Sequence, residues 1–201
     1  MVTDNEETIN KIVSWSKKHL LNIKYRWANN GYSIVSQSMY NFTDLPDIDY
    51  IKETGCNCIG LINLMRLKNN KHLPGFNNNM LIEANLVGSV AVWYKYLKND
   101  FKPFDINSNY PIGTLLIKKS GTNTRYGHVA IISDHNTILH SYPEEYQEYS
   151  SELLEPGICM DNLNLINNIW KDKLNNFFDY SCDPNIWLFK DFTTCCKSYE
   201  I

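Results

Sequence analysis

The sequence lacks the features that mark most secreted, membrane-spanning and nucleic-acid-binding proteins. Its first residues, MVTDNEETIN, are acidic and polar, without the basic and apolar regions of a signal peptide. No apolar run approaches the ~18–20 residues that a membrane span needs. Lysine and arginine are scattered and the net charge is −3, so no basic stripe is present for a nucleic acid. We therefore expect a cytoplasmic or otherwise intracellular protein with no nucleic-acid partner and no transmembrane segment.

Several catalytic signatures are also missing. The chain has no glycine-rich phosphate loop and no serine-hydrolase nucleophile elbow. The Cys-x-Cys pair at Cys56 and Cys58, with two distant histidines, does not match the usual paired zinc spacing. In a reducing compartment we expect the six cysteines of the chain to be thiols rather than disulfides. The sequence predicts neither a metal nor any other cofactor.

The composition is that of an ordinary globular domain. The chain has 201 residues, of which 43% are hydrophobic and 20% charged, which fits a single domain over 1–201. Helical spacing of apolar residues predicts helices at 8–21, 57–68 and 79–98. Short β-rich runs predict strands at 112–119, 126–133, 137–142, 157–163 and 186–192.

The order of these elements predicts the fold class. A helical part at about 5–100, which includes a helical insert at about 77–109, precedes a β-rich part at about 111–201. Helices followed by an antiparallel sheet indicate an α+β fold.

The stretch GCNCIGLINLMRL, residues 55–67, places Cys58 at the start of a predicted buried helix. Unpaired N–H groups and the helix dipole at that end favour an anion, so we expect a lowered thiol pKa and a nucleophilic thiolate. Cys56 lies on the preceding loop and gains less from the helix. The alternative is that Cys58 is a small buried apolar residue, the commonest fate of a cysteine outside disulfides.

Two histidines lie on neighbouring predicted strands. With a three-residue turn at 134–136, Ser133 pairs with Thr137 and Ala130 with His140. Strand alternation then places His128 on the face of Ala130, diagonal to His140. One imidazole can hydrogen-bond the other and fix its tautomer, the geometry of a base and its orienting group. The alternative is a pair of structural histidines that satisfy one another.

The order of these parts resembles a known family. NCIGLI (57–62), GTLLI (113–117), GHVAII (127–132) and TILHSY (137–142) are similar in order and spacing to the motifs of the NlpC/P60 branch of papain-like cysteine peptidases, to which the CHAP amidases are related. Upstream, NIKYRWANNG (22–31) resembles the family's aromatic motif, with Tyr25 and Trp27 in register. Asn57 and Ile59 replace the family's Asp and Ser beside the cysteine.

The resemblance implies a papain-like NlpC/P60 fold, with the nucleophile at the N-terminus of a helix packed on a small antiparallel sheet. It implies a thiol peptidase or amidase that cleaves an amide, isopeptide or related acyl bond through a thioacyl-enzyme. Cys58, His128 and His140 form the triad, the Tyr25 hydroxyl helps to hold the oxyanion, and Asn57 and Trp27 border the substrate.

The departures from the family motif keep other possibilities open. Ile59 removes the polar group with which bacterial members recognise a peptidoglycan amine, so viral members of the superfamily, from large DNA viruses, or intracellular members fit better. That placement implies a virion or host-cytoplasmic location. The alternatives are an inactive papain-like binding or virion structural protein, and an acyltransferase or lipid acyl hydrolase on the same fold.

Overall fold

The computed structural model describes residues 3–36, 39–76, 87–119, 127–142, 156–171 and 176–192. These residues form a mixed α/β architecture built around an antiparallel sheet of six strands. The helices are α1 (Asp4–His19), α2 (Ile48–Thr54), α3 (Cys58–Lys68), α4 (Val90–Leu97), α5 (Leu163–Lys171) and α6 (Pro184–Trp187). The strands are β1 (Ser33–Ser36), β2 (Met39–Asn41), β3 (Lys102–Pro103), β4 (Leu115–Lys118), β5 (His128–Asp134), β6 (Thr137–Tyr142), β7 (Gly157–Asn162) and β8 (Tyr180–Cys182).

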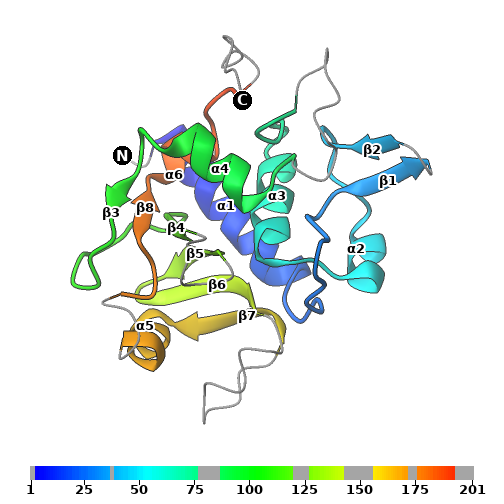
Figure 1. Ribbon diagram of the computed structural model, residues 1–201. Coiled ribbons are helices and arrows are strands. Elements are labelled where there is room, and N and C mark those ends of the chain that lie inside the picture. The colour runs from blue at the N-terminus through cyan, green and yellow to red at the C-terminus, as the bar shows by residue number, and fades with distance from the viewer. Residues whose placement is uncertain are drawn as a thin grey trace.

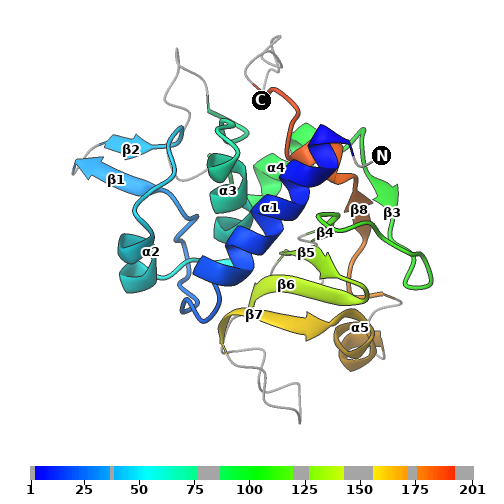
Figure 2. The same cartoon turned by 180° about the vertical axis from the view of Figure 1, so that it is seen from behind.

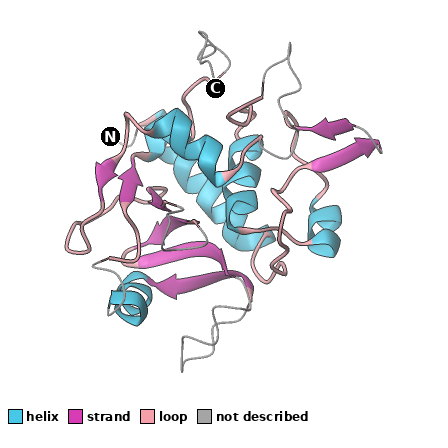
Figure 3. Ribbon diagram, viewed as in Figure 1, coloured by secondary structure: helices cyan, strands magenta, loops and turns pink. Residues whose placement is uncertain are grey.

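Helices α1 and α3 lie between the large sheet and the small β1–β2 hairpin (Figure 1, Figure 3). The large sheet has the order β3-β8-β4-β5-β6-β7, so β5 and β6 are interior and β7 is an edge strand. From behind, α1 runs across the molecule beside the sheet, while α5 lies beside β7 (Figure 2). Within the described ranges, no helix has the length and apolar character needed to cross a membrane.

Side chains on both faces of the sheet are buried, which explains the nearly continuous apolar runs of β4, β5 and β6. On one face, Val129 and Ile131 pack with α1 and α3. On the other face, Ala130 and Ile132 pack with Phe177 and the residues of α5. Because alternate residues of one strand point to opposite faces, His128 lies on the second face with Ala130.

Helix α3 is the buried centre of the first layer. Its internal polar groups are satisfied: Asn63 donates to the carbonyl oxygens of Asn30 and Gly88, and Trp93 Nε1 donates to Asn63 Oδ1 at 2.8 Å. Arg66 is 1% exposed and donates three hydrogen bonds, each 2.6 Å long, to the carbonyls of His72, Trp187 and Lys190. The helix is therefore fixed at both ends and along its length.

The predicted helices and strands agree with the structure to different extents. Helix α1 begins before the predicted residue 8, at Asp4 after the Thr3 cap, while α3 begins at Cys58 and β4 to β7 all form. The strand predicted at 186–192 is wrong, because α6 and a turn occupy its first residues. Elements β1, β2, α2, β3 and β8 were not predicted.

The predicted helix at 79–98 falls partly outside the described residues, which resume at 87. In the described part, the helix α4 begins only at Val90, after the Ser89 cap. Gly88 has a φ of +62° and no room for a Cβ beside Asn63, which is incompatible with a continuous helix through this point.

The β5–β6 hairpin confirms the predicted pairing of Ala130 with His140. The turn differs from the prediction: Asp134 pairs with Thr137 and the ladder is irregular at Ser133. A φ of +57° at Asn136 allows the shorter two-residue turn, and the bulge restores the expected register below it.

Candidate functional site

Cys58 is held in place by the first turn of α3 and the loop packed against it, which are together called the mount below. The Asn57 side chain caps the helix by accepting from the Gly60 N–H at 2.9 Å and donates to Asn30 Oδ1 at 2.9 Å. Gly60 packs closely against the loop before it: a Cβ there would lie 2.8 Å from Cys56 Cβ and 3.1 Å from the Gly31 nitrogen. The glycine two residues after Cys58 therefore lets the loop approach the first helical turn.

The chain after α1 joins this mount to the sheet. Lys24 accepts from the Cys56 N–H at 3.1 Å, and Arg26 donates its N–H to the Cys56 carbonyl at 3.4 Å. Ile158 of β7 donates its N–H to Ile23 at 2.8 Å, and the Ser141 hydroxyl of β6 donates to the Cys56 carbonyl at 3.0 Å. The cysteine segment is thus tied to both β6 and β7.

The Cys58 thiol is nearly enclosed, with 6% of the residue exposed. Burial raises its pKa to about 11, although the backbone N–H groups of Val129, Ile59 and Cys58 itself, which bond to the sulfur, act in the opposite direction. The expected lowered pKa is therefore wrong for this structure. The Val129 contact places the sulfur beside the residue that follows His128, yet no hydrogen bond joins Cys58 to the His128 ring, both of which are described.

Three polar side chains on the neighbouring strands β5, β6 and β7 form a hydrogen-bonded relay, which consists of His128, His140 and Asp161. His128 Nε2 lies 3.0 Å from His140 Nδ1, and His140 Nε2 lies 2.7 Å from Asp161 Oδ2. The two histidine residues are 2% and 0% exposed. Burial raises the pKa of Asp161, but its hydrogen bond and charge interaction with His140, and the hydrogen bond from Cys159, lower it by more. Asp161 is therefore ionised at neutral pH.

The carboxylate determines where the ring protons lie. An ionised Asp161 only accepts, so His140 Nε2 must carry a proton. In neutral His140 the Nδ1 atom is then an acceptor, and His128 Nε2 must donate to it. The Nδ1 atom of a neutral His128 is left with a lone pair. The relay thus leaves His128 Nδ1 able to accept a proton.

His128 is kept neutral by its surroundings. Burial lowers its pKa well below the usual value, and the positive charge that His140 carries when protonated, together with that of Lys118, lowers it further. Lys118 is the cross-strand partner of His128 on β4, and its ammonium lies 4.8 Å from the centre of the Phe177 ring. A neutral imidazole is the form that can take a proton.

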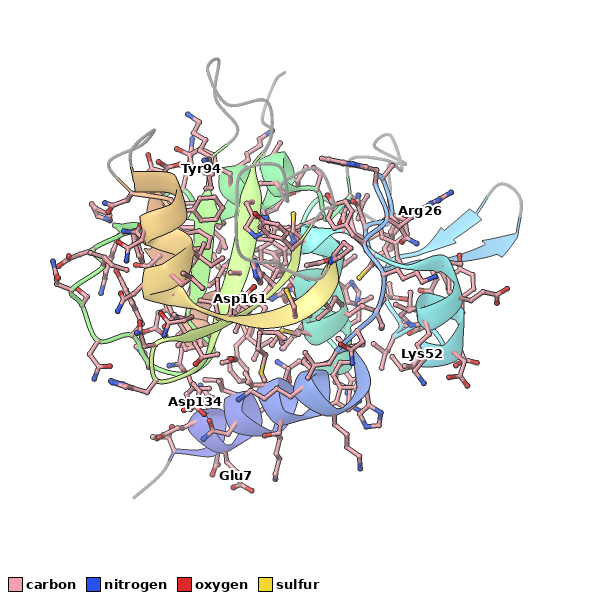
Figure 4. All side chains as sticks on the ribbon, turned by 90° about the horizontal axis from the view of Figure 1, so that it is seen from below. Glu7, Arg26, Lys52, Tyr94, Asp134 and Asp161 are labelled. Carbon is pink, nitrogen blue, oxygen red and sulfur yellow. The ribbon has the colours of Figure 1, made fainter. Side chains whose placement is uncertain are left out.

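Asp161 was missed in the sequence reasoning, which ended the relay at His140. The signal lay in GICMDN: alternation puts Cys159 and Asp161 on one face of β7, and Cys159 is the register partner of His140. Finding it required knowing that β7 pairs with β6, and sequence alone does not give strand order. Figure 4 shows Asp161 on this edge strand.

The three predicted oxyanion and substrate residues lie near the mount rather than in the relay. Tyr25 lies between Lys24 and Arg26, whose backbones bond to Cys56, and its ring meets the Trp27 ring edge-on at 5.3 Å between centroids. Trp27 is 44% exposed. The Asn57 amide is used in capping α3 and in its bond to Asn30.

Comparisons with known proteins do not identify a family. No family model, no curated protein and no solved structure matches the chain.

Proposed function

We propose that this chain is a thiol hydrolase on a papain-like, NlpC/P60-like scaffold, with Cys58 as the nucleophile and His128 as the general base. The observation that carries the proposal is the His128–His140–Asp161 relay together with Cys58 at the N-terminus of α3. The Cys58 sulfur accepts from the backbone N–H of Val129, the residue after His128. The substrate class is an acyl compound with an amide, isopeptide or ester bond.

The first half of the reaction forms the thioacyl-enzyme. The Cys58 thiol, neutral at rest, gives its proton to His128 Nδ1 after a side-chain rotation that aligns the two groups. The sulfur attacks the carbonyl carbon, and the oxyanion is held by the Cys58 backbone N–H and the Tyr25 hydroxyl. The tetrahedral intermediate collapses, and the leaving group departs with the proton from His128.

The second half returns the enzyme to its resting form. Water attacks the thioester as His128 Nδ1 takes its proton, the carboxylic acid leaves, and the sulfur recovers the proton. Whenever His128 is an imidazolium, its Nε2–H donates to His140, whose Nε2–H donates to Asp161. The carboxylate thus stabilises the transient positive charge through the intervening ring.

A second candidate function is a non-catalytic binding or structural protein that keeps the same scaffold. The specific observation in its favour is the state of Cys58: a buried thiol with its pKa raised to about 11 and no hydrogen bond to His128. An inert thiol of this kind does not need the relay that lies next to it. The two candidates differ in whether Cys58 accepts an acyl group.

An acyl-trapping experiment separates them. The protein is mixed with p-nitrophenyl acetate, and release of p-nitrophenolate is followed together with intact mass. We expect a burst and the gain of one acetyl group located on Cys58 by peptide mapping. C58A should remove the burst, and H128Q should slow it by about 10²–10⁴-fold, the usual contribution of a general base.

The matched control is C56A, which removes the neighbouring buried thiol and leaves the relay intact. It should keep the burst. Wild-type turnover in C58A, or equal acetylation of Cys56 and Cys58, would refute the assignment.

A further inference from the structure

A second cluster of reactive side chains shares one residue with the relay. A ring nitrogen of His140, Cys159 Sγ and a carboxylate oxygen of Asp161 lie within 4.8 Å of one another. Cys159 and Asp161 are two residues apart on β7 and so share a face, and Cys159 is the register partner of His140 on β6. Three donors of different chemistry, imidazole, thiol and carboxylate, therefore converge from two rigid strands.

These donors suit Zn²⁺, which binds nitrogen, sulfur and oxygen ligands in a tetrahedron and often uses three protein ligands plus water. Bonds of about 2.0–2.3 Å at tetrahedral angles separate the donor atoms by roughly 3.3–3.6 Å. The Cys159 sulfur lies 3.4 Å from Asp161 Oδ2, and His140 Nε2 lies 2.7 Å from the same oxygen. A small outward movement of the carboxylate makes room for the ion.

The ion can reach these atoms from solvent. Cys159 and Asp161 are partly exposed on the edge strand, whereas His140 is buried behind them. Neither Cys56 nor Cys58, the cysteines of the Cys-x-Cys pair, belongs to this cluster.

We propose that His140, Cys159 and Asp161 form a Zn²⁺ site whose occupation switches the relay off. Binding replaces the proton on His140 Nε2 with the metal, so neutral His140 must carry its proton on Nδ1. Nδ1 then donates to His128 Nε2, and the proton of neutral His128 moves to Nδ1. The lone pair that accepts the Cys58 proton is lost. Cys159 releases one proton to solvent on binding as a thiolate.

Charge acts in the same direction. Without the ion, the Asp161 carboxylate contributes one negative charge that stabilises an imidazolium at His128. With the ion bound to a thiolate and a carboxylate, the site has no net charge. The consequence for activity depends on the proposed function, but the binding of the metal does not.

Metal binding is tested first. Zinc affinity and stoichiometry are measured by competition with a chromophoric chelator in a C195S/C196S background, because that cysteine pair lies outside the described residues. We expect one zinc per chain, and an affinity at least about tenfold weaker in C159S, since a direct ligand is lost. C58A in the same background should bind zinc as its parent does.

The site is overturned if C159S binds zinc like its parent, or if C58A alone abolishes binding, which would place the ion on the nucleophile. X-ray absorption at the zinc edge of the background protein tests the site without a substitution at any proposed ligand: one sulfur with nitrogen and oxygen ligands is expected. A shell of two or more sulfurs contradicts the proposal.

The switch is tested by acyl-trapping rates with one equivalent of zinc and with excess chelator. The ratio of the rate with chelator to the rate with zinc should be at least about tenfold lower in C159S than in the background protein. Equal ratios in the two proteins overturn the switch. If C58A reacts like the parent, the hydrolase proposal fails, while the chelator competition still decides the metal site.

Discussion

Asp161 Oδ2 on the edge strand β7 lies 2.7 Å from His140 Nε2, and the opposite ring nitrogen of His140 lies 3.0 Å from His128. The carboxylate is therefore two hydrogen bonds away from the group that we assign as the base. Its effect on His128 passes through the tautomer of His140 rather than through contact with a substrate.

Replacing Asp161 tests this indirect role. In D161N the amide NH₂ can donate to His140 Nε2, which favours a proton on Nδ1 and reverses the hydrogen bond to His128. We expect kcat to fall by roughly 10- to 100-fold, with little change in KM, because the loss concerns proton transfer and not binding.

D161A is the matched control. It removes the acceptor without adding a donor, so it should impair activity less than D161N. NMR of ¹⁵N-labelled histidine reports the tautomers directly: the protonated ring nitrogen of His128 should change from Nε2 to Nδ1 in D161N. An unchanged tautomer together with full activity would contradict the relay.

Lys118 should contribute to the acid limit of the proposed activity. Its charge lowers the pKa of His128, in addition to the larger effect of burial and the effect of His140. The base works only when neutral, so the wild-type protein should remain active well below pH 6.5. In K118M the pKa of His128 rises, and the acid limb of the kcat/KM profile should move to higher pH.

K119M provides the control for Lys118, because Lys119 is exposed, the next residue along the chain, and carries the same charge. Measured with chelator present, its profile should match the wild type. An acid limb that stays in place in K118M would show that Lys118 does not influence the base.

Local pattern was enough to predict the parts of the site that depend on neighbouring residues. The helix start at Cys58 and the pairing of Ala130 with His140 follow from residue type and alternation, whereas the Asn57 cap was not predicted. The raised pKa of Cys58 could not be predicted this way, because it depends on burial by α3 and the sheet together. Asp161 also required strand order.

Buried thiols should make the protein sensitive to alkaline pH. Burial raises the pKa values of Cys56 and Cys182 to about 12, and that of Cys58 to about 11, whereas a thiol in the unfolded chain ionises near pH ~8.5. Above pH ~9 the unfolded chain has lost protons that the folded chain retains. The free energy of unfolding should therefore fall by up to about 1.4 kcal/mol per pH unit for each thiol.

Urea unfolding at pH 7 to 10.5 measures this dependence. Because lysine and tyrosine also titrate in this range, the informative quantity is the difference in slope between the wild type and C182A. The variant should lose stability less steeply above pH 9, whatever its stability at neutral pH. Parallel curves would mean that the folded protein exposes this thiol to ionisation.

Gly60 gives a test of the mount in which two effects have opposite signs. Alanine is favoured over glycine inside a helix by about 1 kcal/mol. Here, however, the added Cβ would lie 2.8 Å from Cys56 Cβ and 3.0 Å from the Asn29 carbonyl oxygen, both parts of a loop held by backbone hydrogen bonds. Relieving such overlap typically costs 1–3 kcal/mol.

G60A should therefore lower the free energy of unfolding in urea. It should also reduce acyl trapping at temperatures where the variant is fully folded, because the loop and Cys58 move apart. A stabilised, fully active G60A would mean that the loop does not pack against the first turn of α3.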